Sequence, residues 1–546
     1  MSDTAPSQAA ELLVIDFVII GGGISGLTAA IGLARAGQRV TLLEQADDFQ
    51  ETNLAGGCRL APNMTRLYFR WGLEQQLRDI AYMQQYVCFM RSETGESAAQ
   101  GEWVHDFKVE SGGVFLGMHY ADFRRLLYET AIKSGATIRT NAKVASADLD
   151  AESPSVTLEC GERIRADVIV GADGTHSVSR SLMLEHDEMR PTGMVLHNAI
   201  IPMDKMASEP GLAEFLPKDG LGTAWSWAGH TCGVIGFPTK REEFHLHIYA
   251  PESGRENLPT KSPVNMSTSE ELIAIMRKEG CESRLTKMVE MATRVMVLPV
   301  IDKPELDDWV HDCERYVVIG EAAHPLTTGS LYALSIAAGD GMMLGRLFSY
   351  LHRPEQIGSF LAAFAENRHR RVQAIKRAQS TNPASMSMPP GVLQAKTLKG
   401  VVESMGDAEA AWYTEEIPIM SAKKKGNPLP LGDTLRDLAL LRASDCDLSS
   451  TLPSSSDPRA TRGTTCCWRS QQRGERVCRA VVRVREGDEG GYPVAPSRGG
   501  GQAGRQAGGC QEQAGGRREG AGGRGSTLMR VVSVLATALR FGCRAH

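Results

Sequence analysis

Apolar and polar positions near the start of the chain follow the pattern of a strand, a tight turn and a helix. An apolar run covers Asp16–Ile20, and glycines follow it. Apolar residues then recur at helical spacing, at Leu27, Ala30, Ile31 and Ala34. The helix is expected to stop at Gly37, and Arg39–Leu43 is expected to form a second buried strand that ends at Glu44. The pattern predicts a βαβ unit with parallel strands.

The pattern changes in the middle of the chain. Short stretches rich in β-forming residues are separated by turn residues between about Val195 and Pro251, and the clearest of them are Cys232–Phe237 and Glu243–Tyr249. Helical spacing returns over Ser267–Met291. We therefore expect an α/β fold in which a doubly wound parallel sheet carries an inserted β-rich domain.

The composition changes again beyond Asp445. The basic residues of Cys446–His546 are all arginine, glycine runs are common and apolar periodicity is missing, so this segment is predicted to be a disordered low-complexity tail. An arm that binds RNA or another anionic surface, a solvated linker, and translation out of frame are alternative explanations of the tail. Residues 381–445 are predicted to form a C-terminal helical segment.

Composition and charge narrow the class of protein. The 546 residues are 42% hydrophobic and 23% charged, which is enough for several packed domains. A formal net charge of −5 gives no basic footprint, so no nucleic-acid partner is expected. Twelve scattered cysteines without a CxxC pair, and a start without a signal-peptide pattern, favour reduced thiols and a cytoplasmic location. The apolar stretch Leu12–Ile20 is interrupted by Asp16 and too short for a transmembrane span, so none is expected.

The first motif is the glycine run Gly21-Gly22-Gly23-Ile24-Ser25-Gly26, a GxGxxG between the predicted strand and helix. Gly21 allows a tight turn, Gly23 lets the backbone approach a pyrophosphate, and Gly26 permits close helix packing. The phosphates would lie at the helix N-terminus, where unpaired N–H groups favour anions. Glu44 follows 18 residues after Gly26, and its carboxylate can accept from both ribose hydroxyls but disfavours a 2′-phosphate. The motif predicts the adenosine half of FAD or NAD.

Two further motifs also follow apolar strands. Ala166–Gly171 leads into a turn at Asp173 and Gly174, although Asp-Gly is also a common turn by itself. Tyr316–Ile319 leads into Gly320-Glu321-Ala322-Ala323-His324-Pro325. Ligands of open α/β sheets bind at the carboxyl ends of such strands.

In this order and at these separations, the three motifs resemble those of the FAD-dependent aromatic-hydroxylase class (class A) of flavoprotein monooxygenases, which includes salicylate hydroxylase. The resemblance runs from about Phe17 to Ser380, and it includes the glycine-rich segment 56–63 and the helix around 364–371. It implies cofactor-binding roles for Gly21, Gly23, Gly26 and Glu44 at the ADP half of FAD, Gly57 and Arg59 on the flavin side, Asp173 and Gly174 at the pyrophosphate and NAD(P)H, and Glu321 and Ala322 at the ribityl and isoalloxazine region.

The resemblance also implies an organisation and an activity. A Rossmann-like FAD-binding domain would comprise residues 12–194 and 301–380, with a substrate domain at 195–300. FAD would be reduced by a transiently bound NAD(P)H and would react with O2 to a C4a-hydroperoxide that hydroxylates an aromatic or other electron-rich small organic substrate. An FAD-dependent epoxidase or terpenoid-tailoring oxygenase of secondary metabolism, and a non-catalytic flavin-fold binding protein, are the alternatives. The motifs assign neither a catalytic residue nor an oligomeric state.

The chain departs from the family pattern at four sites. Glu321 stands where aspartate is usual, and Tyr120 stands where the family has an arginine that contacts flavin. Thr327-Thr328 replaces a frequent proline, and Gly339 replaces the acidic residue before Asp340. One cationic flavin contact is therefore expected to be missing.

Several other residues allow a functional or a structural interpretation. His324 is expected to shape its loop rather than act as a base. Trp225 and Trp227 are expected to pack in a core, although they could stack on an aromatic substrate together with His230. His245 and His247 share one strand face, but they lack a third ligand, so no metal site is predicted. Met342 and Met343 are expected to be core residues.

Overall fold

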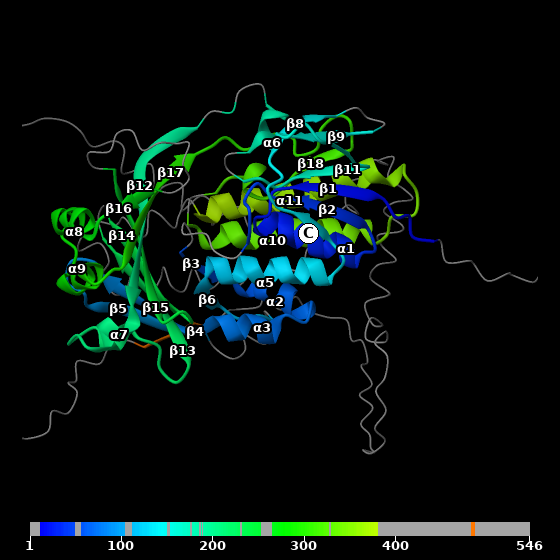
Figure 1. The fold of residues 1–546 in the computed structure, drawn as a ribbon. Coiled ribbons are helices and arrows are strands. Elements are labelled where there is room, and N and C mark those ends of the chain that lie inside the picture. The colour runs from blue at the N-terminus through cyan, green and yellow to red at the C-terminus, as the bar shows by residue number, and fades with distance from the viewer. Residues whose placement is uncertain are drawn as a thin grey trace, which may run out of the picture. The chain divides into compact units, whose positions relative to one another are not determined.

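The computed structural model describes residues 11–49, 56–103, 112–149, 153–174, 177–184, 187, 189–229, 232–252, 265–326, 329–379 and 482–485. Figure 1 shows how their helices and strands are arranged. The βαβ unit predicted near the N-terminus is confirmed, because β1 (Asp16–Ile20), α1 (Ile24–Arg35) and β2 (Arg39–Leu43) follow one another. The strand bounds agree with the apolar runs of the sequence.

A five-stranded sheet holds the predicted parallel strands. Its order is β18-β11-β1-β2-β7, and every neighbouring pair is parallel. The strands added to β1 and β2 are β7 (Thr137–Arg139), β11 (Val168–Gly171) and β18 (Tyr316–Val318). Because β2 lies on one side of β1 and β11 on the other, the strand order reverses at β1. The carboxyl end of β1 is therefore the expected ligand crevice of this sheet.

Helices and a small sheet surround these parallel strands. The helices are α1, α2 (Pro62–Arg70), α3 (Glu74–Ile80), α5 (Tyr120–Lys133), α6 (Val178–Ser181), α10 (Leu331–Phe348) and α11 (Gln356–Gln379). A small antiparallel sheet consists of β8 (Val144–Asp148), β9 (Ser155–Leu158) and β10 (Arg163–Arg165). In Figure 1, α1 and α10 lie on one side of the parallel sheet, and β8 and β9 lie on the other. The parallel strands, α1, α10, β8 and β9 contribute to one hydrophobic core. The predicted α/β, Rossmann-like fold is therefore confirmed.

A second sheet of eleven strands carries the β-rich part of the fold. Its path runs β16-β17-β12-β15-β14-β13-β4-β5-β19, while β3 and β6 pair with each other beside β4. The strands are β3 (Gly57–Leu60), β4 (Ala81–Arg91), β5 (Ser97–Trp103), β6 (Leu116–His119), β12 (Arg190–Pro202), β13 (Leu221–Ala228), β14 (Gly233–Thr239), β15 (Glu243–Pro251), β16 (Asn265–Ser267), β17 (Arg294–Asp302) and β19 (Val482–Arg485). The predicted strands 232–237 and 243–249 correspond to β14 and β15.

The large sheet uses more of the chain than the range 195–300 predicted for the β-rich domain. β12 begins at Arg190, and β17 ends at Asp302. Strands β3 to β6 come from residues 57–119, and β4 pairs in parallel with β13. Sequence periodicity indicates that a strand exists, but it does not indicate which distant strand supplies its hydrogen bonds.

Four residues of the C-terminal tail are an exception to the expected disorder. Val482–Arg485 form β19, which pairs antiparallel with β5. The alternating Val-Arg-Val-Arg sequence has the period of a strand, and the edge of β5 offers unpaired backbone groups to it. The rest of the tail and the segment 381–445, predicted to be helical, lie outside the described residues.

Helices predicted over 267–291 cover the outer side of the large sheet. They are α8 (Ser269–Lys278) and α9 (Ser283–Glu290), and the short helices α7 (Met203–Ala207) and η1 (Ala213–Phe215) precede them in the chain. Phe244, Leu246 and Ile248 of β15 belong to the hydrophobic core of this layer. Because side chains alternate along a strand, His245 and His247 lie on the opposite, inner face.

Trp225 and Trp227 pack in this outer core, which confirms their interpretation as core residues. Trp227 is fully buried, and Trp225 packs against the same cluster. The ring centre of Phe215 lies 4.8 Å from that of Trp225 and 5.5 Å from that of Trp227. Neither indole shares the inner face with His245, so neither is placed to stack on a substrate there.

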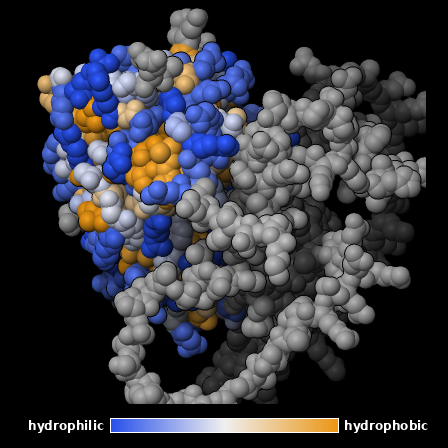
Figure 2. Space-filling view, turned by 90° about the vertical axis from the view of Figure 1, so that its right-hand side faces the viewer, coloured by the Kyte–Doolittle hydropathy of each residue, from blue (hydrophilic) through white to orange (hydrophobic). Residues whose placement is uncertain are grey.

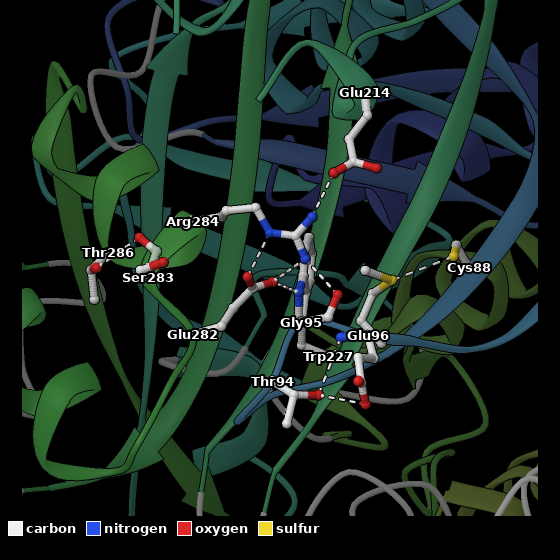
Figure 3. Close-up of polar contacts among 11 residues, drawn as sticks. Cys88, Thr94, Gly95, Glu96, Glu214, Trp227, Glu282, Ser283, Arg284 and Thr286 are labelled. Carbon is white, nitrogen blue, oxygen red and sulfur yellow. Dashed lines mark hydrogen bonds and ion pairs between the residues drawn. The ribbon is translucent and has the colours of Figure 1, made fainter. Parts of the chain in front are cut away.

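A buried carboxylate joins α9 to this aromatic cluster (Figure 3). Glu282 accepts hydrogen bonds from Trp227 Nε1 at 2.8 Å and from Arg284 Nε at 2.6 Å. Arg284 also reaches Glu214 Oε1 at 2.5 Å and the Gly95 carbonyl at 2.5 Å. The Arg284 guanidinium therefore connects η1, the turn after β4 and the start of α9.

Glu282→Gln is expected to lower the free energy of unfolding by about 2 kcal/mol. The substitution removes the charge that balances the partly buried Arg284 and leaves an amide that cannot accept all of its hydrogen bonds. Glu290→Gln is the matched control, because the Glu290–Arg277 pair of 3.5 Å is exposed on both sides and should change stability by less than about 0.5 kcal/mol. Urea unfolding of both variants measures the difference, and equal losses would contradict the interpretation.

Close contact between α1 and α10 depends on glycine. A Cβ atom at Gly345 would lie 2.5 Å from the backbone carbon of Gly32, and one at Gly341 would lie 2.4 Å from the backbone nitrogen of Ala29. Because these neighbours are backbone atoms of a helix, they cannot move independently. The backbones of the two helices can approach this closely only where side chains are missing.

Gly345→Ala is therefore expected to lower the free energy of unfolding by about 1–3 kcal/mol, the usual range for overpacking a core. Arg346→Ala is the control on the same helix, since Arg346 is exposed and its loss should cost less than about 1 kcal/mol. Thermal unfolding of the two variants compares them. An unchanged melting temperature for Gly345→Ala would show that α10 can shift away from α1 at no cost.

The described surface offers small apolar patches. On the face shown in Figure 2, hydrophobic residues form separate patches among hydrophilic ones. The large hydrophobic side chains that are exposed are Val14, Ile132 and Met266. Among the described residues, no helix combines the length and the apolar character required to cross a membrane.

Candidate functional site

The three sequence motifs meet at the carboxyl ends of adjacent strands. β1 leads into the glycine run, β11 into Asp173 and β18 into Gly320, and these strands are neighbours in the parallel sheet. A Cβ atom at Gly21 would lie 2.6 Å from the Ala172 carbonyl oxygen, and one at Gly320 would lie 2.6 Å from Ser25 Oγ. The structure therefore brings together segments that are far apart in the sequence.

Gly21, Gly23 and Gly26 of the first motif differ in the structural reason for the missing side chain. Gly21 has a φ of +103°, a conformation that side chains disfavour, and a Cβ at Gly26 would lie 2.0 Å from the Gly21 carbonyl oxygen. Gly23 is different, because its φ is −76° and a Cβ there would meet no atom within 4 Å in the part of the chain that the structure describes. It is the N-cap of α1 and offers no side chain to the first turn of the helix. The N-terminus of α1 is thus open at Gly23, as an approaching phosphate would require.

Glu44 is buried and bound to the glycine loop. Its carboxylate accepts hydrogen bonds from the Gly22 N–H at 2.8 Å and the Ala46 N–H at 2.9 Å, and it pairs with Arg124 at 3.0 Å. A carboxylate has about four acceptor positions. The described residues occupy three of them, which leaves an acceptor position for a ribose hydroxyl, while the predicted contact with both hydroxyls remains a prediction.

Arg124 is a site residue that the sequence did not single out. It lies on α5, donates to the Gly22 carbonyl oxygen at 2.9 Å and stacks on the Phe49 ring at 4.3 Å from its centre. Together with Glu44 it holds the glycine loop from the side of β2. An arginine pair in a helix is a common surface pattern, and only the fold shows that Arg124 is buried.

In the second motif, Asp173 stabilises its own turn. Its carboxylate accepts hydrogen bonds from Ser177 Oγ and, at 3.1 Å, from the Ser179 N–H. Burial raises the pKa of this carboxyl above the usual aspartate value, although these hydrogen bonds act in the opposite direction. Gly174 has a φ of +75°, and a Cβ there would meet none of the described atoms within 4 Å. The hydrogen bonds of Asp173 thus stabilise the turn, while Gly174 leaves space beside it.

The third motif is held by a buried ionic network. Asp340 on α10 accepts from the Gly320 N–H at 2.9 Å, contacts His324 Nε2 at 2.6 Å and pairs with Arg368 Nε of α11 at 2.6 Å. Burial alone would raise the pKa of Asp340, but His324 and Arg368 reverse this effect and lower it. The prediction that His324 shapes the loop is confirmed, since its side chain is buried in this network.

The departure at Gly339 follows from the same network. A Cβ at Gly339 would lie 2.8 Å from a terminal nitrogen of Arg368. The missing side chain makes room for the guanidinium that pairs with Asp340. Arg368 lies in the segment 364–371, which is similar to a helix of the family, but no role was predicted for it.

Arg180 connects the second motif with the third. It is fully buried on α6 and donates to the Ala322 carbonyl oxygen at 2.7 Å. Asp187 balances its charge, with 3.0 Å between Arg180 Nη2 and the carboxylate. Ala322 itself is buried, in the 3₁₀ helix η2 (Gly320–Ala322), while Glu321 is half-buried there. Their predicted contacts with the ribityl and isoalloxazine region remain predictions.

Gly57 and Arg59 lie on β3, against the inner face of the large sheet. The Gly57 N–H donates to His245 Nδ1 at 2.9 Å, and a Cβ at Gly57 would lie 2.7 Å from the His245 ring. The Arg59 guanidinium lies 5.7 Å from the centre of the Phe237 ring. Packing against β14 and β15 thus accounts for the glycine, and the predicted flavin contacts of both residues remain predictions.

Tyr120, which replaces an arginine of the family pattern, begins α5 beside the cofactor motifs. Its N–H donates to the Gly56 carbonyl oxygen at 2.9 Å. Burial raises the pKa of its phenol to about 12, and the charges of Arg124 and Glu321 also act on it. The phenol therefore stays neutral and lies between the first and third motifs. Thr327-Thr328, a further departure from the family pattern, lies outside the described residues.

The inner face of the large sheet carries polar side chains opposite these motifs. His245 and His247 of β15 share this face, as predicted, and no group of metal ligands forms among the described residues. Burial and the charge of Arg59 lower the pKa of His247 to about 3, so its ring is neutral. A Cβ at Gly329, after the third motif, would lie 2.6 Å from Tyr249 Oη. His230 lies outside the described residues.

These features fit the adenosine and pyrophosphate half of FAD. The open N-terminus of α1 at Gly23 suits the pyrophosphate, and the remaining acceptor position of Glu44 suits a ribose hydroxyl. The flavin half would extend past Gly57 and Tyr120 toward the third motif. Asp173 and Gly174 border the same crevice, because Gly21 contacts the backbone of Asp173.

Comparison with known proteins gives the same assignment. A family model described as an FAD binding domain matches residues 14–379. The chain is 28% identical over 384 residues to an FAD-dependent monooxygenase, OpS4, of Beauveria bassiana (strain ARSEF 2860), which covers 70% of this chain and 87% of the relative. It is 28% identical over 330 residues to 3-hydroxybenzoate 6-hydroxylase 1 of Aquipseudomonas alcaligenes, which covers 60% of this chain and 79% of the relative.

Solved structures share the fold at lower identity. FqzB superposes with a TM-score of 0.64 at 19% identity, covering 78% of this chain and 94% of that structure. A salicylate hydroxylase substrate complex superposes with a TM-score of 0.58 at 19% identity, covering 74% of this chain and 98% of that structure.

Proposed function

The chain belongs to the FAD-dependent aromatic-hydroxylase family of monooxygenases, and we propose that it uses NAD(P)H and O2 to hydroxylate a small aromatic or other electron-rich organic substrate. The protein is thus an FAD-dependent oxidoreductase. The observation that carries the proposal is the meeting of three motif loops at the carboxyl ends of β1, β11 and β18, beside the inner face of a large sheet.

FAD would supply the redox chemistry and the activation of oxygen, which no side chain of the protein can provide. The chain would bind its phosphates at Gly23 and its ribose at Glu44. Arg124 and the Asp340 network would keep the loops in place before the cofactor binds, so that little ordering is left for the binding step. The known relatives named for 3-hydroxybenzoate and 6-hydroxynicotinate support an aromatic substrate.

The substrate would lie between the flavin and the inner face of the large sheet. Phe237, the neutral His247 and Tyr249 face this region from β14 and β15, and Arg59 approaches it from β3. Burial raises the pKa of Tyr249 to about 12, so its phenol stays protonated. Aromatic and neutral polar groups of this kind suit a planar ring with polar substituents.

The test begins with the visible absorption spectrum of the purified full-length protein, followed by NADPH or NADH in air. We expect a flavin spectrum that bleaches on reduction and recovers as O2 is consumed. Substrate-stimulated NAD(P)H oxidation with a panel that includes 3-hydroxybenzoate and 6-hydroxynicotinate then separates an enzyme from a flavin-binding protein without catalysis. A colourless protein that cannot be reconstituted with FAD would contradict the proposal.

A further inference from the structure

Two thiols meet on the outer side of the large sheet, although they lie far apart in the sequence. Cys232 directly precedes β14, and Cys281 lies in the turn between α8 and α9. The two thiols are close enough to interact, since each shifts the pKa of the other. Ser92 Oγ donates to the Cys281 sulfur at 3.6 Å. Both cysteines are free thiols and share one hydrophobic cluster.

Backbone hydrogen bonds fix the position of Ser92 beside the two cysteines. The Ser92 N–H donates to the Ala228 carbonyl oxygen at 3.1 Å, and the Ser92 carbonyl oxygen accepts from the Glu282 N–H at 2.7 Å. A Cβ at Gly229 would lie 2.7 Å from the Cys232 carbonyl oxygen and 2.9 Å from Ser92 Cβ. Ser92 therefore lies next to both cysteines, at the point where the α8–α9 turn meets the sheet.

The two sulfurs differ in access and in chemical environment. Cys232 is buried with 1% of its surface exposed, whereas Cys281 is half-buried. Interaction with the Cys232 thiol lowers the pKa of the Cys281 thiol, while burial and the Glu279 and Glu93 carboxylates oppose it. At Cys58 and Cys88, by contrast, burial raises the thiol pKa. A thiolate that accepts a hydrogen bond from Ser92 and can be reached from solvent is the form that reacts with oxidants.

We propose that Cys232 and Cys281 form a peroxide-reactive dithiol in which Cys281 is oxidised first and Cys232 then closes a disulfide. The Cys281 thiolate attacks one oxygen of hydrogen peroxide, the O–O bond breaks, and the sulfur becomes a sulfenic acid while hydroxide leaves and is protonated to water. The Cys232 thiol then attacks that sulfur, an S–S bond forms, and the sulfenic oxygen leaves as water with the Cys232 proton. Two thiols and one peroxide give one disulfide and two waters.

The disulfide would join Cys281, in the turn between α8 and α9, to Cys232, which directly precedes β14. Glu282, the neighbour of Cys281, also binds Trp227 of β13 and Arg284 of α9. Oxidation therefore adds a covalent link at the place where the outer helical layer already holds the sheet. The inference does not depend on the proposed function, because added hydrogen peroxide is the only oxidant required.

Peptide mapping of the full-length protein tests the proposal. The protein is treated with one equivalent of hydrogen peroxide, free thiols are alkylated, and the trypsin digest is analysed by mass spectrometry. Trypsin places Cys232 in the peptide 219–240 and Cys281 in the peptide 279–284, so the disulfide appears as one linked pair. We expect Cys281 to be oxidised about ten times faster than the exposed Cys160.

Three variants separate the steps. Cys232→Ser should stop the reaction at a Cys281 sulfenic acid that dimedone traps, and Cys281→Ser should leave Cys232 unmodified. Ser92→Ala should slow the first step, while Cys88→Ser, the matched control, should leave the linked pair unchanged. Oxidation of Cys281 no faster than that of Cys160, or a Cys281 sulfenic acid that persists in the unaltered protein, would overturn the proposal.

Discussion

Replacing Gly23 with alanine is expected to weaken FAD binding about 100-fold while the fold stays intact. A Cβ at Gly23 meets no atom of the described residues within 4 Å, and the backbone conformation suits alanine, so the apoprotein should keep its melting temperature. The methyl group would instead occupy the space through which a phosphate approaches the N-terminus of α1. Hydrogen bonds to a charged group contribute about 1.5–3 kcal/mol each, so the loss of one or two gives about this factor.

Gly26→Ala is the matched control for this experiment. A Cβ at Gly26 would lie 2.0 Å from the Gly21 carbonyl oxygen, so the strand-to-helix turn itself must open. This variant should lose both thermal stability and FAD, whereas Gly23→Ala should lose FAD alone. FAD titration of the apoproteins, together with their melting temperatures, measures both effects. Unchanged FAD affinity in Gly23→Ala would show that the pyrophosphate does not lie at the N-terminus of α1.

Asp340→Asn is expected to lower the free energy of unfolding by about 3–5 kcal/mol and to release FAD. Asp340 has no exposed surface and is the carboxylate that pairs with the buried Arg368. Without its charge the guanidinium stays buried and unbalanced, which is the situation that makes loss of one partner costly. The Gly320 N–H also loses its charged acceptor, so the turn that carries Glu321 is no longer fixed.

Two further variants locate the effect in the buried network. Asp340→Asn combined with Arg368→Gln removes the unbalanced cation and should recover part of the lost stability. Glu366→Gln, which breaks an exposed pair with Arg370 on the same helix, should cost less than about 0.5 kcal/mol. Urea unfolding with and without FAD gives the free energies. A loss below about 1 kcal/mol for Asp340→Asn would contradict the role given to this network.

The pKa of Asp340 adds a pH dependence with a definite sign. Because the folded-state pKa is lowered, the carboxylate contributes stability at any pH above its unfolded value of about 3.8, and this stability is lost as the pH falls through the lower folded value. The unaltered protein should therefore lose more stability than Asp340→Asn on acidification below about pH 4. Parallel pH profiles for the two proteins would contradict the assignment.

Local sequence patterns predicted the parts of the fold that depend on near neighbours. The bounds of β1 and β2 followed from apolar runs, and the need for glycine at Gly21 followed from the tight turn after a strand. Helical spacing likewise predicted α8 and α9. Each of these features depends on residues only a few positions apart, so a single stretch of sequence contains the information.

Long-range contacts account for what the sequence did not predict. Arg124 and Arg368 have charged partners far away in the chain, at Glu44 and Asp340, and neither helix has a pattern that marks a buried arginine. The packing of Gly57 against His245 of β15 was also not predicted, because the two residues are 188 positions apart. The large sheet takes β3 to β6 from a region that the sequence placed with the parallel strands.

The sequence by itself determined the order of the three motifs, the strands that lead into them, and the resemblance to FAD-dependent monooxygenases. Only the tertiary structure decided which charged groups hold these loops and how many acceptor positions of Glu44 remain for a ribose. The structure also shows that Trp225 and Trp227 pack in the outer core and not on the inner face of the large sheet. The physical reason is that hydrophobic periodicity and backbone conformation are local, while ion pairing and packing depend on the position of distant segments in space.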